Sequence, residues 1–360
     1  MIRNAVALTL LVVFAGSLCA DEINYYKKGA KYREIANHNS VEITGWSAAK
    51  VDFKGADGKT GSVPGTDIIS VNRAYGTMHN DLNRAIERVG SDPEAAIPAL
   101  KTIAASGKSA LDKEEALFWH ALVYVNEANA GGDISRAITE LSAYLKAYKA
   151  GFFARDAYRM TADLQRRTKK FSDARTTLKS MISADNALAR EGNQMLGELE
   201  LSEKQYAEAL RAFQAAKTQA ARDGNKNAEY LAQAWEGTAQ QAKGDAAAAK
   251  SLLEPITSNP DFDDPMSFDD ELALAVAYPA LGDAYYGSGN FEKAYDAYVQ
   301  AGYYAWWTQG QQEGYCIGQA YLCARKLEST DDKWKKRKDK LRTALAVGFP
   351  RELQRVDKEK

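Results

Sequence analysis

The spacing of hydrophobic residues divides the chain into a strand-like part and a longer helix-like part. In residues 22–74, apolar positions alternate with polar ones in short runs, as at Val51 and Phe53, and Gly, Asp and Pro separate the runs. Alternation with a period of two is typical of strands that bury one face, and the Asp57-Gly58 pair indicates a tight hairpin. The pattern predicts four or five strands, which in so short a unit should close into a small all-β barrel.

From about Thr77 the strand signal ends, and small or apolar residues return at helical spacing. The stretch "YPALGDAYYGSGNFEKAYDAYVQAGYY", residues 278–304, repeats Ala, Gly and Tyr on both sides of a "GSGN" break. Two such runs around a Gly-rich break predict two antiparallel helices joined by a turn. The same frame recurs upstream, so the helical part is predicted to consist of repeated hairpins.

The repeated frame resembles the tetratricopeptide repeat family, in which each repeat pairs two antiparallel helices. The small residue of the first helix recurs at Ala162, Gly197, Gly237, Gly282 and Gly318, with separations of 35, 40, 45 and 36 residues against 34 in the family. The resemblance implies a mostly α protein, an α-α superhelix of five to seven hairpins over residues 77–346, followed by a tail at 347–360. It also implies that a set of small and large residues packs within and between hairpins: Gly197, Ala209, Phe213, Ala216, Gly237, Ala249, Leu281, Gly282, Tyr285, Ala294, Tyr298 and Ala301.

The strand-like part resembles the Src-homology-like or Sm-like barrels that precede helical repeats in some exported bacterial proteins. The resemblance rests on the segment "VDFKGADGKTGSVPGTDIISV" within residues 22–74. Trp46 and Phe53 could line a peptide-docking groove there, or they could fill a small core that needs large side chains.

The first 20 residues have the features of an export signal. Arg3 precedes the apolar run "AVALTLLVVFAG", and the small residues of "GSLCA" predict cleavage after Ala20. A lipoprotein signal with an acylated Cys19 is the alternative, although Leu18 stands where a small residue is preferred. No later apolar run reaches a membrane-spanning length. We therefore expect an exported protein, periplasmic or extracellular, that could associate with the envelope.

Composition and motifs argue against several chemistries. The chain has 47 Lys and Arg against 48 Asp and Glu, so no basic excess favours nucleic acid. Its three His are far apart, which argues against a His-rich metal site. Cys316 and Cys323 would lie about 10.5 Å apart on one helix, too far for a disulfide, so we expect buried core residues. No hydrolase, metalloprotease or phosphate-loop motif is present, and we expect neither a cofactor nor enzymatic activity.

The repeat resemblance implies a partner-binding surface, because exposed first-helix residues line the concave side of such arrays. None of the repeats combines the Lys and Asn that clamp a C-terminal carboxylate, so capture of that kind is not expected. The sequence predicts a non-catalytic scaffold or adaptor that binds a protein or peptide partner. The residues at the partner-binding places are Arg159, Asp163, Gln194, Glu198, Asp283, Tyr286, Tyr315 and Gln319, with Ala234 and Thr238 in the repeat between.

Three other segments leave alternatives open. Asp261 and Asp263 lie in an acidic loop without Gly, which favours a solvated loop over a calcium site. The aromatic cluster at residues 303–307 could stack on a sugar or pack between repeats. The basic segment at residues 333–342 could form a capping helix or attract anionic lipid or wall polymer. The alternative functions are therefore an envelope-polymer or carbohydrate binder, and a lipid-anchored envelope assembly factor.

Overall fold

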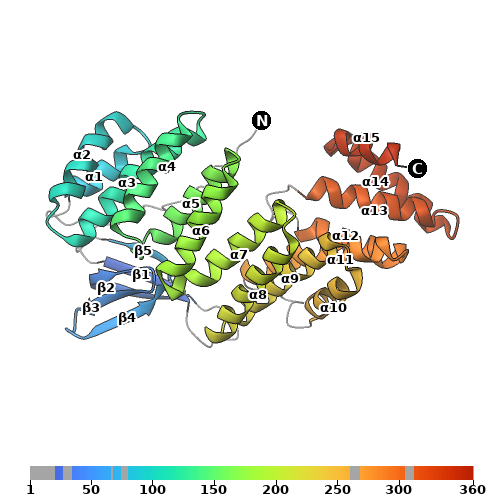
Figure 1. The fold of residues 1–360 in the computed structure, drawn as a ribbon, viewed down its shortest axis with the longest axis horizontal. Coiled ribbons are helices and arrows are strands. Elements are labelled where there is room, and N and C mark those ends of the chain that lie inside the picture. Colours follow the sequence, from blue (N-terminus) through green and yellow to red (C-terminus); the bar gives the residue numbers. More distant parts are fainter. Residues whose placement is uncertain are drawn as a thin grey trace.

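The protein consists of one small antiparallel sheet followed by a long row of helices (Figure 1). The computed structural model describes residues 21–26, 35–65, 68–73, 80–259, 268–304 and 312–359. The predicted export signal, the acidic loop residues Asp261 and Asp263, and the tryptophans of the aromatic cluster lie outside these ranges.

The sheet has the strands that the alternating pattern predicts. Its members are β1 (Asp21–Tyr26), β2 (Ile35–Trp46), β3 (Lys50–Gly55), β4 (Thr60–Pro64) and β5 (Ile68–Asn72). They are ordered β4-β3-β2-β1-β5, and every neighbouring pair is antiparallel. The predicted Asp57-Gly58 turn joins β3 to β4, with Gly58 at φ 78°, a backbone region that glycine reaches without strain.

Closure of this sheet into a barrel is not seen. Within the described strands β4 and β5 remain the two edges. The apolar face of the sheet, which includes Ile23, Val51 and Phe53, is instead covered by Leu111 and Phe152 from the helical part. A sheet buries its apolar face against another layer when one is available, and here the helical part supplies that layer.

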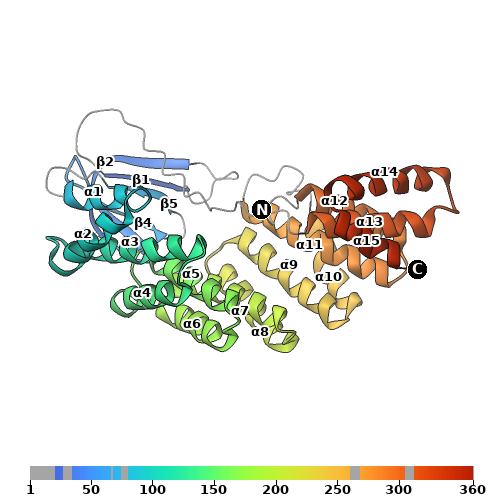
Figure 2. The same cartoon turned by 90° about the horizontal axis from the view of Figure 1, so that it is seen from above.

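The helical part is a row of hairpins. Its helices are α1 (Asn80–Arg88), α2 (Pro93–Ser106), α3 (Ala110–Asn129), α4 (Ile134–Ala147), α5 (Ala154–Arg167), α6 (Phe171–Ala184), α7 (Asn186–Ser202), α8 (Tyr206–Arg222), α9 (Lys226–Lys243), α10 (Ala246–Thr257), α11 (Phe268–Gly287), α12 (Phe291–Tyr304), α13 (Glu313–Leu327), α14 (Asp332–Gly348) and α15 (Pro350–Lys358). Each helix packs on the next, which gives seven hairpins in the described ranges, from α1/α2 to α13/α14. Figure 2 shows α3, α5 and α7 on the side of the row that carries the sheet, and α4, α6 and α8 on the opposite side. We call the side formed by the first helix of each hairpin the first-helix face.

Within several hairpins, the two helices contact each other at one recurring pair of residues. In α7, α9 and α11 the small residue of the first helix faces a large residue sixteen positions later, on the second helix. A Cβ atom at Gly197 would lie 2.4 Å from a ring carbon of Phe213, and one at Gly237 would lie 2.5 Å from Leu253. Gly282 approaches Tyr298 in the same way, at 2.7 Å. Such approaches leave no room for any side chain, which is the physical reason for glycine in these first helices.

A second recurring position lies seven residues after the small residue, in the turn between the two helices. Lys169, Lys204, Gly244 and Gly289 occupy it, with φ values of 59°, 59°, 97° and 77°. In each turn the next residue donates its N–H to a carbonyl five positions back, at 2.8–3.0 Å. This is the Schellman end of a helix, which requires a left-handed residue and is most easily met by glycine.

Lys204→Gly is expected to stabilise the protein slightly. A non-glycine residue in the left-handed region costs about 1 kcal/mol, and the greater freedom of glycine in the unfolded chain removes part of the gain. The net increase in the free energy of unfolding should be about 0.5 kcal/mol, measured by urea denaturation. Gly244→Lys at the equivalent turn is the matched control and should lower the same quantity by about 1 kcal/mol. If Lys204→Gly destabilises the protein, the turn is held by contacts of the lysine side chain instead.

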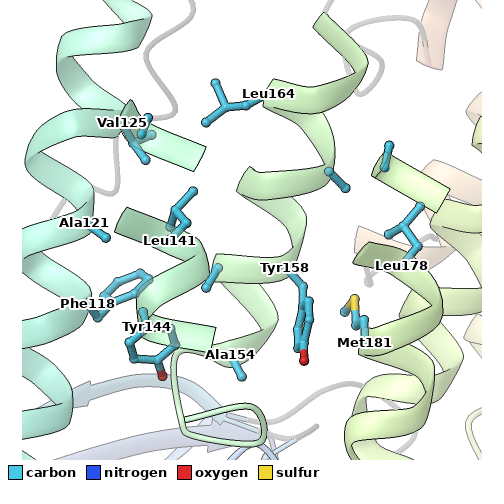
Figure 3. Close-up of a cluster of buried hydrophobic side chains, with 14 of the residues drawn as sticks. Phe118, Ala121, Val125, Leu141, Tyr144, Ala154, Tyr158, Leu164, Leu178 and Met181 are labelled. Atoms are coloured by element: carbon cyan, nitrogen blue, oxygen red, sulfur yellow. The ribbon is translucent and has the colours of Figure 1, made fainter. Parts of the chain in front are cut away.

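The largest core cluster joins the hairpins α3/α4 and α5/α6. Figure 3 shows Phe118 and Tyr144 on one side of this cluster and Tyr158, Leu178 and Met181 on the other. All five side chains are buried. The apolar residues recur at three- and four-residue spacing on each helix, so consecutive hairpins share one continuous core, as expected for a repeat array.

Helix α11 differs from its neighbours because it is apolar on all sides. Its buried residues include Leu274, Val276, Ala277 and Leu281, which do not share one helix face. A helix without a polar face is one that is surrounded by protein, and α11 packs on α9, α10 and α12. Within the described ranges, no helix is both long and apolar enough to cross a membrane.

The C-terminal residues 347–360, expected as a tail, hold the helix α15. Pro350 begins it, as proline often begins a helix. Val356 is fully buried, and Phe349 lies against Gly314 of α13. The many charged residues of this segment conceal a single apolar stripe, which the sequence pattern alone did not reveal. The array is therefore capped by α14 and α15 together.

Candidate functional site

The sheet is fixed to the first-helix face by buried acidic residues of α3. The carboxylate of Glu114 accepts hydrogen bonds from Trp46 Nε1 at 3.0 Å, Tyr144 Oη at 2.8 Å and the Phe152 backbone N–H at 2.7 Å. Loss of water raises the pKa of this carboxyl, while the three donors act to lower it. The indole of Trp46 also stacks on Phe152, with ring centroids 4.8 Å apart. Trp46 is thus used to hold two parts of the protein together.

A second contact of the same junction is an ion-pair triad. Arg73, which directly follows β5, binds Asp112 at 2.9 Å and Glu115 at 2.8 Å. All three side chains are nearly inaccessible to water. Charges that are buried in this way need partners, because an unpaired one would carry its full desolvation cost. The junction therefore sets the position of the sheet beside α3 and α5.

Next to the sheet, the first-helix face carries two parallel polar rows. On α5 the row contains Arg159 and Asp163, and on α7 it contains Glu191, Gln194 and Glu198. The rows contact one another, because Arg159 Nε lies 3.4 Å from a Glu191 oxygen. The Arg159 side chain is 54% exposed and that of Glu191 26%. Four of the predicted partner-binding residues, Arg159, Asp163, Gln194 and Glu198, are thus brought together on one accessible surface.

Glu198 is the least favourable residue of these rows for stability. It is half-buried, and its one described hydrogen bond comes from Gln194 Nε2, at 3.2 Å. Burial raises the pKa of the Glu198 carboxyl, and the neighbouring charges of Arg166, Glu191 and Arg159 partly cancel one another. The charged carboxylate therefore lowers the stability of the folded protein at neutral pH.

Glu198→Gln is expected to raise the thermal midpoint by roughly 1–3 °C at pH 7–8. The amide keeps the shape of the side chain and removes the buried charge. Because the folded pKa lies above the unfolded value near 4.5, the advantage should disappear as the pH falls below that value. Asp163→Asn is the control, since Asp163 is 46% exposed and is paired with Arg166 at 3.0 Å. An equal midpoint for wild type and Glu198→Gln at pH 8 would contradict this assignment.

Of the two residues that the repeat frame places at the partner-binding positions of α9, only Thr238 is partly accessible. Ala234 is fully buried, and it packs in the core shared with α11. Thr238 is half-buried and donates its hydroxyl hydrogen bond to the Ala234 carbonyl, at 2.9 Å. The polar surface of α5 and α7 therefore ends where α11 packs onto α9.

Asp283 and Tyr315, two further residues of the predicted partner-binding set, are half-buried and bind each other. One oxygen of Asp283 accepts hydrogen bonds from Tyr298 Oη and Tyr315 Oη, both at 2.6 Å. Burial raises the pKa of Asp283, and the two hydroxyl donors act to lower it. These three residues join α11, α12 and α13, so their role is packing between hairpins.

Tyr286 is also a packing residue. Its ring meets Phe291 edge-on at 5.3 Å, and it lies against the buried clusters of α13 and α15. Gln319 is half-buried on α13. Asp283, Tyr286 and Tyr315 therefore contribute to the cohesion of the last two hairpins and α15.

A hollow of about 730 Å³ lies on the other side of the array, between α6, α7 and α8. Arg175 and Glu200 form a bidentate pair at its wall, at 2.5 and 2.7 Å, and Arg211 pairs with Glu208 at 2.7 Å. Lys179 completes the basic side chains that line it. The sequence analysis did not identify this hollow, because its residues lie on three helices and its charged residues do not belong to the repeat frame.

The remaining sequence candidates are distributed over the C-terminal hairpins. Cys316 and Cys323 are free and buried, and burial raises the pKa of each thiol to about 12. Trp334 of the basic segment is buried against Tyr295, which gives α14 the predicted capping role. Among the described residues, no group of three His, Cys, Asp or Glu side chains is arranged to hold a metal ion.

The comparisons with known proteins relate this chain to other helical arrays. No family model and no curated protein matches it. The type IV pilus biogenesis factor PilW is 18% identical over 66% of this chain and 96% of its own, with a TM-score of 0.45. The apo quorum sensor NprR from B. thuringiensis is 18% identical over 77% and 79%, with a TM-score of 0.49. A tetratricopeptide repeat protein from Parabacteroides merdae is 14% identical over 73% and 98%, with a TM-score of 0.41. Similarities of this size carry no argument about function.

Proposed function

We propose that this protein is a non-catalytic scaffold that binds a segment of a partner protein on the first-helix face of α5 and α7. The observation that carries the proposal is the pair of accessible polar rows, joined by Arg159 and Glu191 at 3.4 Å. Charged side chains held beside one another in this way offer a partner fixed hydrogen-bonding groups at little cost in side-chain entropy. The sheet, fixed to α3 by Arg73 and Glu114, bounds this surface at one end.

The proposed setting is outside the cytoplasm. The features that support it are Arg3, the apolar run after it and the small residues before Ala20. The absence of sequence motifs for hydrolysis or phosphate binding supports the non-catalytic assignment. The location and the lack of catalysis are both parts of the proposal. The binding experiment below takes the proposed location into account, because its pool of partner proteins is prepared from the cell envelope.

The test is a crosslinking pull-down from native envelope with three forms of the full-length protein. The first is the wild type, and the second carries Arg159→Ala and Gln194→Ala. The third is a matched control with Lys179→Ala and Arg211→Ala, which removes two side chains of the hollow on the opposite side. Asp283 and Tyr286 are left intact because they hold hairpins together. All three forms should have the same helical circular dichroism.

We expect the wild type and the control to capture one defined protein. The Arg159→Ala, Gln194→Ala variant should capture at least tenfold less of it. The tenfold loss corresponds to about 1.4 kcal/mol. If only the control loses the partner, the hollow is the binding surface and the proposal is wrong. If wall polymer is recovered in place of a protein, the second candidate below takes its place.

The second candidate function is binding of an anionic envelope polymer or carbohydrate by the C-terminal hairpins. Tyr303 supports it, because 76% of this residue is exposed at the end of α12. On α14, Lys335, Lys336 and Lys340 are exposed and form no ion pair within the described part of the chain. Wild type and a Tyr303→Ala variant should then differ in sedimentation with purified cell-wall sacculi. A lipid-anchored assembly factor is the remaining alternative, which the mass of the mature N-terminus would identify.

A further inference from the structure

The ion pairs of the polar rows are unequally distributed. Each arginine of α5 that faces the rows already has an acidic partner. Arg155 lies 3.2 Å from Glu191, Arg159 lies 3.4 Å from Glu191 and 3.6 Å from Asp156, and Arg166 lies 3.0 Å from Asp163. Within the described residues, Glu198 is the acid of these rows that has no Lys or Arg at ion-pair distance.

The surroundings of Glu198 explain why its lack of an ion-pair partner matters for binding. Its carboxylate is half-buried and is held by the amide of Gln194 at 3.2 Å, so its position is defined. The charged groups that face it from α5 are Arg159 and Arg166, and the one from its own helix is Glu191. These arginines attract the Glu198 carboxylate, but the acids at ion-pair distance from them are Glu191, Asp156 and Asp163. A half-buried carboxylate in this situation gains most from a cation brought by another molecule.

We propose that Glu198 receives a basic side chain, Lys or Arg, of the bound partner segment. This inference rests on the proposed function and specifies the partner of the same surface. An acidic partner side chain would meet Glu191 and Glu198 at close range, and the arginines nearby already bind acids. An apolar side chain would remove water from Glu198 without replacing its hydrogen bonds, which is unfavourable. A basic side chain satisfies the carboxylate and leaves the existing pairs intact.

The experiment uses a random peptide library displayed on phage as the probe. The library is selected in parallel on the full-length wild type, on Glu198→Gln and on Asp163→Asn. Glu198→Gln keeps the size and the Gln194 contact but removes the charge. Asp163→Asn is the matched control, because it removes an acid of the same polar rows that already has an arginine partner. The midpoint of thermal unfolding verifies that all three forms are folded.

We expect peptides selected on the wild type and on Asp163→Asn to share a Lys or Arg at one aligned position. Glu198→Gln should lose this preference, and one such peptide should bind it about 10- to 100-fold more weakly, the range for a hydrogen bond to a charged group. Replacing the basic residue of that peptide with Met should weaken wild-type binding to the same extent and leave the Glu198→Gln complex unchanged.

The other outcomes separate the two proposals. Peptides that bind the first-helix face without a preferred basic residue would overturn the role of Glu198 and leave the scaffold function standing. Equal binding of the basic peptide by wild type and Glu198→Gln would do the same. If no peptide is selected, or if the selected peptides still bind the Arg159→Ala, Gln194→Ala variant, the first-helix face is not a peptide-binding surface and both proposals are wrong.

Discussion

Arg73→Ala is expected to lower the free energy of unfolding by roughly 3–5 kcal/mol. The guanidinium of Arg73 binds Asp112 at 2.9 Å and Glu115 at 2.8 Å, and all three side chains are buried at the junction between sheet and helices. Removing the cation leaves two carboxylates close together in a site that excludes water. Urea denaturation followed by circular dichroism measures the effect.

The control and the rescue distinguish the ion-pair triad from a general effect of losing an arginine. Arg84 is exposed on α1, and Arg84→Ala should change the stability by less than about 0.5 kcal/mol. Adding Asp112→Asn and Glu115→Gln to Arg73→Met should restore a large part of the loss, because no unpaired charge then remains. If Arg73→Ala lowers the free energy of unfolding by less than 1 kcal/mol, the triad does not stabilise the junction as described. The two carboxylates would then be solvated or protonated in the variant at little cost in stability.

Phe213→Ala is expected to cost about 3–5 kcal/mol, the range for removing a buried aromatic side chain. Phe213 is fully buried on α8, where its ring fills the space beside Gly197 and stacks on Trp235 with centroids 5.8 Å apart. Trp235 belongs to α9, so the ring joins one hairpin to the next. Because the units of an array stabilise only their neighbours, unfolding should begin at α7, α8 and α9.

Hydrogen exchange resolved by peptide is the measurement for this second variant. Protection should fall first in α7–α9, while the hairpin α3/α4 keeps wild-type protection. Val299→Ala provides the control, because Val299 is an apolar residue that is 44% exposed, and its loss should cost little. If protection falls evenly along the whole chain, the array unfolds as one cooperative unit and the neighbour-limited description is wrong.

The helical hairpins could be predicted because their cause is local. Gly197, Gly237 and Gly282 stand where the second helix brings Phe213, Leu253 and Tyr298, and the constant spacing of sixteen residues repeats in the sequence. The mostly helical part of the predicted fold class follows from this repetition. The short β segments could also be predicted, because the alternation of apolar and polar residues and the Asp57-Gly58 turn are local signals.

The candidate site could be predicted only in part. Arg159, Asp163, Gln194 and Glu198 were placed on the first helices by the repeat frame, and the structure brings them together on α5 and α7. The same frame placed Asp283 and Tyr315 on the partner-binding face, and it did not predict that their polar atoms bind each other and Tyr298 across three helices. Position within a repeat indicates a helix face, but the next hairpin decides whether that face is covered.

By itself, the sequence determined most of the segments that form strands and helices, where the hairpins turn and which small residues let helices approach. These properties depend on neighbours a few residues away, or at a fixed spacing. Only the tertiary structure decided that the sheet packs on α3, that α15 caps the array, and that Glu198 has no Lys or Arg at ion-pair distance within the described residues, while Arg159 and Arg166 have their acids. Each of these depends on contacts between residues whose separation along the chain follows no repeat, so no pattern in the sequence records them.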